Sequence, residues 1–98
     1  MTEKQISEIA KEKLKKDGYT YWFPPRTWGE RDIMGVFDFI AAKERNIIMV
    51  QLTTIQHLSD RRKKIQNFYR ANNIGPLRGV FVWAYHPVKE TWKIEKII

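Results

Sequence analysis

The sequence contains no cysteine, which excludes disulfide scaffolds, thiolate metal sites and cysteine nucleophiles together. It also has no apolar run near the roughly 20 residues that a membrane-spanning helix needs. Residues 1–16 lack the apolar core of a signal peptide, so we expect a cytoplasmic protein with no membrane partner. With only 98 residues and no linker or repeat, the chain is expected to form one domain, residues 1–98.

What the sequence has in excess is positive charge. Eighteen Lys and Arg residues against eleven Asp and Glu give a net charge of +7. A hydrophobic content of 43% excludes a disordered basic tail. The charge favours a polyanionic partner such as nucleic acid, although a basic surface can also serve solubility alone.

The order of periodic segments predicts a single α/β domain. Helical periodicity predicts a first helix that begins after Thr2 and ends at Asp17, and a second that Ser59 caps. Apolar runs predict strands over residues 19–23, 33–42, 47–54, 79–86 and 91–98. The order is therefore α-β-β-β-α-β-β, a mixed sheet flanked by helices, with a central hairpin formed by 33–42 and 47–54.

Two polar positions break the apolar pattern of that hairpin. Asp38 lies inside an apolar run, where an unpaired carboxylate would cost several kcal/mol. It is either a structural carboxylate bonded within the fold or a metal-binding or catalytic group. Gln51 and Thr53 follow an apolar run and point to one face of the next strand. They are either a strand ending in polar residues or part of a site with Asp38.

This arrangement resembles the PD-(D/E)XK nuclease superfamily, and within it the small archaeal Holliday-junction resolvases. The likeness rests on residues 18–20, 35–41 and 48–54, and on the two closing strands. It implies a restriction-endonuclease-like core and a DNA endonuclease that acts on junctions or other structured DNA. It also implies a Mg²⁺ (or Mn²⁺) cofactor and a homodimer, because a four-way junction presents two symmetry-related strands.

The resemblance also assigns the site residues. Asp38 matches the family aspartate, Gln51 takes the glutamate position and Thr53 the lysine position, so these three are the candidate catalytic residues. The candidate metal ligands are Asp38, Gln51 and Asp32, because Mg²⁺ takes oxygen ligands. Gln51 offers a carbonyl oxygen without charge, and Thr53 carries no positive charge.

The two predicted helices offer candidates for the lysine charge that the motif lacks and for the family acid of the first helix. Lys63 or Lys64 can supply the missing positive charge if one of them reaches the site. The family acid on the first helix would fall near Ser7 or Glu8. Glu8 points away from the apolar stripe of that helix, whereas Glu3 lies close to it.

A nucleic-acid surface is expected on two segments. The first is the basic run of the second helix, of which Arg61 and Arg62 are expected nearest the site. The second is a loop in which Trp28, placed between two arginines, either stacks on an unpaired base or folds back onto the core. The predicted nucleic-acid contacts are Arg26, Trp28, Arg31, Arg61, Arg62, Lys63 and Lys64.

Three functions follow from these features. The first is a DNA-binding nuclease-fold protein that cleaves DNA with Mg²⁺. The second is a catalytically inactive relative that only binds nucleic acid, which the departures from the family pattern at Thr53 and Ser7 favour. The third is a protein-interaction subunit without a nucleic-acid role, which would use the aromatic side chains of the closing strands.

Overall fold

A computed structural model describes residues 1–25, 32–75 and 77–97 of the chain. Within these ranges, two α-helices and a five-stranded mixed sheet confirm the predicted α/β class and the α-β-β-β-α-β-β order. The elements in chain order are α1 (Glu3–Lys16), β1 (Thr20–Trp22), β2 (Phe39–Lys43), β3 (Asn46–Thr54), the 3₁₀ turn η1 (Ile55–His57), α2 (Leu58–Ala71), β4 (Val80–His86) and β5 (Thr91–Lys96).

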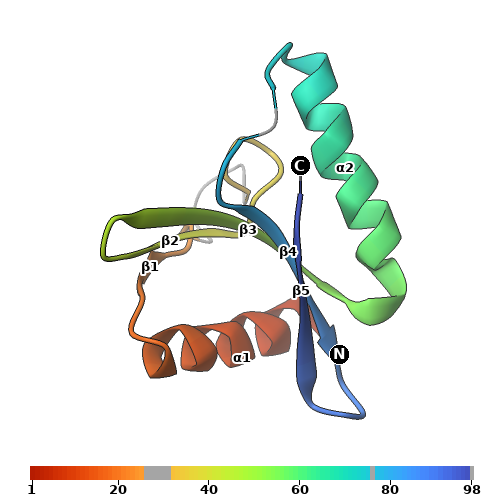
Figure 1. The fold of residues 1–98 in the computed structure, drawn as a ribbon. Helices are drawn as coiled ribbons and strands as arrows, with labels where there is room; N and C mark the ends of the chain where they lie inside the picture. Colours follow the sequence, from red (N-terminus) through yellow and green to blue (C-terminus); the bar gives the residue numbers. More distant parts are fainter. Residues whose placement is uncertain (26–31, 76, 98) are drawn as a thin grey trace.

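The sheet follows the order of the sequence, β1-β2-β3-β4-β5 (Figure 1). Its pairs are antiparallel except β3 and β4, which run parallel and are connected through η1 and α2. A parallel pair needs such a crossover connection. The β2–β3 hairpin lies inside the sheet, as predicted, with Lys43 opposite Asn46 at its tight end.

The two helices pack on opposite faces of the sheet (Figure 1). Ile6, Ala10 and Leu14 of α1 share one buried cluster with side chains of β2, β3 and β4. Leu58, Ile65 and Tyr69 of α2 belong to a second cluster on the other face. No helix in the described ranges is long and apolar enough to cross a membrane.

The aromatic side chains of the closing strands contribute mainly to the protein's own packing. Trp83 and Tyr85 are buried, whereas Phe81 and Trp92 are half-buried against the α1 cluster. Of the aromatic side chains that were expected to bind a protein partner, only Phe81 and Trp92 are therefore partly exposed on these strands.

The helix boundaries confirm one predicted cap and correct the other. Thr2 and Gln5 form a reciprocal capping box at α1, and Asp17 ends that helix, with Gly18 following at a φ of 83°. In α2 the N-cap is His57, which makes no side-chain cap hydrogen bond. The prediction that Ser59 caps α2 is therefore wrong, because η1 leads directly into the helix and places Ser59 in its first turn.

The strand predicted over residues 33–42 is also shorter than expected. Ile33 pairs with Phe37 in an isolated bridge, closed by Met34 and Gly35 at φ values of 56° and 72°. This tight turn interrupts the strand, so β2 begins only at Phe39. Phe37 therefore packs in the α2 cluster and Phe39 in the α1 cluster, although a continuous strand would place both on one face.

Candidate functional site

The site begins where β3 extends beyond the end of β2. The β2–β3 pairing stops at Phe39 opposite Val50, while residues 51–54 of β3 continue to pair with β4. Asp38, just before β2, covers the edge that is left open. Its backbone N–H donates to the Val50 carbonyl at 2.8 Å, and its Oδ2 accepts from the Leu52 N–H at 2.6 Å.

The side chain of Gln51 also binds the Asp38 carboxylate. Its Nε2 donates to Asp38 Oδ2 at 2.8 Å and to the Leu52 carbonyl at 3.2 Å. Both bonds to the Asp38 carboxylate use Oδ2, and no described residue donates to Oδ1. Asp38 thus has a structural role at the β3 edge and still presents one carboxylate oxygen for other chemistry.

The surroundings of Asp38 disfavour its charged form. The side chain is half-buried, and burial is the main reason that the pKa of Asp38 rises from 3.8 to about 6. The Leu52 N–H opposes this rise by bonding to the carboxylate. The negative charges of Asp32 and Glu3 raise the pKa further, and the positive charge of Lys64 lowers it.

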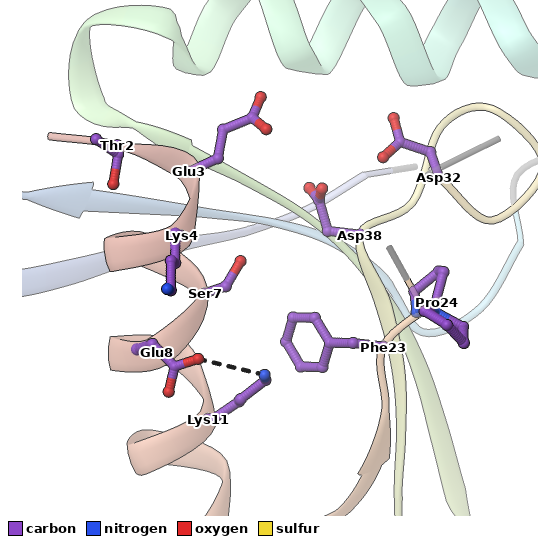
Figure 2. A pocket seen from close by; sticks show the side chains of 11 residues that line it. Thr2, Glu3, Lys4, Ser7, Glu8, Lys11, Phe23, Pro24, Asp32 and Asp38 are labelled. Carbon is purple, nitrogen blue, oxygen red and sulfur yellow. Dashed lines mark hydrogen bonds and ion pairs between the residues drawn. The ribbon is translucent and has the colours of Figure 1, made fainter. Parts of the chain in front are cut away.

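These charged groups line one cavity of about 340 Å³. Its acidic side chains are Glu3 from α1, Asp32 from the turn before β2, and Asp38. Figure 2 shows the three carboxylates turned toward a common space. Two cations of α2, Arg61 and Lys64, also line the cavity, so it holds charges of both signs.

An adjoining cleft along α1 identifies the acid of the first helix. Glu3 and Ser7 line both the cavity and this cleft, together with Asp32 and Asp38 (Figure 2). Glu8 lines only the cleft and forms an ion pair with Lys11 at 3.4 Å. Of the two acids considered from the sequence, Glu3 is therefore the one that the structure brings to Asp38.

Gln51 and Thr53 were predicted to share one face of the strand, and the structure places both side chains at the cavity. Both side chains are buried and line the cavity. The NH₂ end of the Gln51 amide faces Asp38, and its Oε1 is buried with no hydrogen-bond partner in the described structure. In this conformation Gln51 positions Asp38, and its oxygen becomes a ligand only if the amide rotates.

The basic side chains of α2 contact two different parts of the protein. Arg61 and Lys64 line the cavity, and Lys64 Nζ lies 3.7 Å from Asp32 Oδ2. Arg62 instead forms a bidentate ion pair with Glu95 of β5, with Nη2 2.9 Å from Oε2. This contact lowers the pKa of Glu95 through its hydrogen bond to Arg62. Arg62 therefore connects α2 to β5, a contact that the sequence alone does not predict.

The remaining candidates lie apart from the cavity or outside the described residues. Lys63 is exposed and does not line the cavity, so Lys64 is the lysine of α2 that reaches it. Arg26, Trp28 and Arg31 fall outside the residues that the structure describes.

The donor set decides whether a magnesium ion fits. Within residues 1–25, 32–75 and 77–97, no group of three or more His, Asp or Glu side chains is arranged to hold a metal ion. Mg²⁺, however, usually keeps several waters and is bound through one or two carboxylates. Asp38 and Asp32 line one cavity, and no described residue donates to Asp38 Oδ1, so these two carboxylates offer the oxygen ligands that such a water-rich site needs.

The chain was also compared with known proteins. No family model, no curated protein and no solved structure matches it. A functional proposal for this chain therefore depends on its own residues.

Proposed function

We propose that this chain is a nuclease-fold protein with a restriction-endonuclease-like core, which hydrolyses phosphodiester bonds in DNA with Mg²⁺ or Mn²⁺. The observation that carries the proposal is the cavity at the end of β3, which the carboxylates of Glu3, Asp32 and Asp38 line together with Arg61 and Lys64. The protein acts as a cytoplasmic homodimer on junctions or other structured DNA, since two copies match the symmetry of a four-way junction.

Each side chain has a role in this proposal. Asp38 Oδ1 and Asp32 would hold the metal, which would supply Lewis-acid chemistry at the phosphate and at the attacking water. Gln51 fixes the orientation of the Asp38 carboxylate through its 2.8 Å hydrogen bond. Arg61 and Lys64, which line the same cavity, neutralise the phosphate. Lys64 replaces the charge that Thr53 does not supply.

A second candidate is a relative that binds DNA and does not cleave it. The observation in its favour is that Asp38 is held by Gln51 and Leu52, with the Gln51 oxygen turned away from the carboxylate. These hydrogen bonds alone give Asp38 a structural role, and that role requires no metal ion and no catalysis. This candidate predicts salt-sensitive DNA binding without cleavage.

The test is cleavage of linear, branched and single-stranded DNA in Mg²⁺ and in Mn²⁺. Asp38→Asn keeps an acceptor for the Leu52 N–H but removes the charge, so we expect cleavage to fall by about 100-fold or more. The control is Glu12→Gln, which removes an exposed charge of α1 away from the cavity and should leave the rate unchanged.

Other outcomes would decide against the proposal. Equal cleavage by wild type and Asp38→Asn would remove Asp38 from the site. DNA retardation without cleavage in either metal would support the binding-only relative. A wild-type protein that retards no nucleic acid at low salt would leave the interaction subunit as the remaining function.

A further inference from the structure

Lys64 occupies an unusual place for a group that should act on a phosphate. Its Nζ lies 3.7 Å from Asp32 Oδ2, and both side chains line the cavity beside Asp38. Neither side chain is fixed by burial, with exposed fractions of 36% for Lys64 and 31% for Asp32. The lysine is therefore paired with one of the two carboxylates that would receive a metal ion.

We infer that Lys64 and a divalent cation compete for Asp32, so that cation binding releases Lys64 to the phosphate. This inference rests on the proposed function, because it assigns a regulation to the same site. A carboxylate that binds a divalent cation loses most of its attraction for an ammonium group, since the two cations repel each other. Lysine carries its charge on a flexible four-carbon stem, so a released ammonium can move along the cavity wall.

The position of Lys64 on α2 indicates where the released side chain would lie. Arg61 lies one turn earlier on the same helix and lines the same cavity. A lysine that leaves Asp32 therefore remains in the cavity that Arg61 also lines. Before the cation arrives, Lys64 offsets part of the negative charge of Asp32, with which it is paired, and of Asp38, whose pKa it lowers. Without a divalent cation, Lys64 is paired with Asp32 and is not free to bind the phosphate.

The experiment measures Mn²⁺ binding to the free protein by calorimetry, without DNA. Lys64→Met removes the competitor, and we expect the Mn²⁺ affinity to rise by about 3- to 10-fold. Lys63→Met removes an equal charge from an exposed neighbouring position and should leave the affinity unchanged. Thermal unfolding of each variant checks that it is folded.

A double variant separates competition from general electrostatics. If Lys64 acts through Asp32, then adding Lys64→Met to Asp32→Asn should give no further gain in Mn²⁺ affinity. A gain that persists in the Asp32→Asn background would show that Lys64 repels the ion without competing for Asp32, and would overturn the inference.

The outcomes also separate this inference from the proposed function. Wild-type protein that binds Mn²⁺ with the same affinity as Lys64→Met would overturn the competition and leave the metal site intact. Wild-type protein that binds no Mn²⁺ at millimolar concentration would remove the metal site, and the proposed hydrolysis with it. Tighter Mn²⁺ binding with slower DNA cleavage in Lys64→Met would support both.

Discussion

At pH 8, the Asp38→Asn variant is expected to unfold with a free energy about 2 kcal/mol larger than that of the wild type. The reason is that burial and the nearby charges of Asp32 and Glu3 raise the pKa of Asp38 from 3.8 to about 6. A shift of one unit corresponds to about 1.4 kcal/mol between the two protonation states, less what partial exposure screens. Asparagine keeps an oxygen that accepts from the Leu52 N–H and the Gln51 amide.

The stability gain of Asp38→Asn over the wild type should increase with pH. Because the folded-state pKa is raised, the neutral carboxyl contributes its stability fully below about pH 3.8, and that contribution is lost as the pH rises through about 6. Asparagine stays neutral throughout, so the advantage of Asp38→Asn should be near zero at pH 3.5, should grow between pH 4 and 7, and should then level off. Urea unfolding at these pH values measures it.

Asp17 provides a control of opposite sign. Its carboxylate lies 2.9 Å from Lys13 Nζ, and this hydrogen bond lowers the pKa of Asp17. Asp17→Asn should therefore give no gain in stability at pH 8. If Asp38→Asn were no more stable than the wild type at pH 8, the ionised Asp38 would be well accommodated, and its unfavourable position could no longer indicate a functional role.

The fold was predictable because each element has a strong local signal. The α1 stripe at Ile6, Ala10 and Leu14 and the apolar run of β3 identify their elements without knowledge of the tertiary structure. The early part of the predicted strand 33–42 was not predictable in the same way. Its residues are as apolar as a strand, and the turn depends on Met34 and Gly35 adopting positive φ, which hydrophobic periodicity does not encode.

The site was predictable only where a residue contradicts its own neighbours. Asp38 and Gln51 interrupt apolar runs of the sequence, and the structure joins them by a hydrogen bond. The choice between Lys63 and Lys64 depends on a helix rotation of about 100° per residue, and therefore on how α2 sits against the sheet. The Arg62–Glu95 ion pair joins residues 33 positions apart, so only the tertiary structure reveals it.

Gly79→Ala is expected to destabilise the protein by about 3 kcal/mol or more. Gly79 has a φ of 74°, and a Cβ at this position would overlap the Ile47 carbonyl oxygen. The strained backbone and the overlap each cost about 1–3 kcal/mol, and a backbone oxygen cannot rotate away as a side chain can. Urea unfolding at neutral pH measures the loss.

The other glycines provide matched controls for this effect. A Cβ at Gly75 would have no atom within 4 Å, so Gly75→Ala should change stability by well under about 1 kcal/mol. Gly18, at a φ of 83°, has only the end of the Lys43 side chain nearby, so Gly18→Ala isolates the backbone strain at about 1 kcal/mol. Equal losses at Gly18 and Gly79 would contradict the close approach of Gly79 to β3.

The position of Gly79 connects this loss to the site. The Gly79 carbonyl accepts from the Met49 N–H at 2.8 Å, immediately before the parallel pairing of Met49 with Val80. That pairing fixes the register of β3, and a shift of one residue would turn Gln51 to the other face of the sheet. Any folded Gly79→Ala protein should therefore also bind Mn²⁺ more weakly, because Asp38 would lose the amide that orients it.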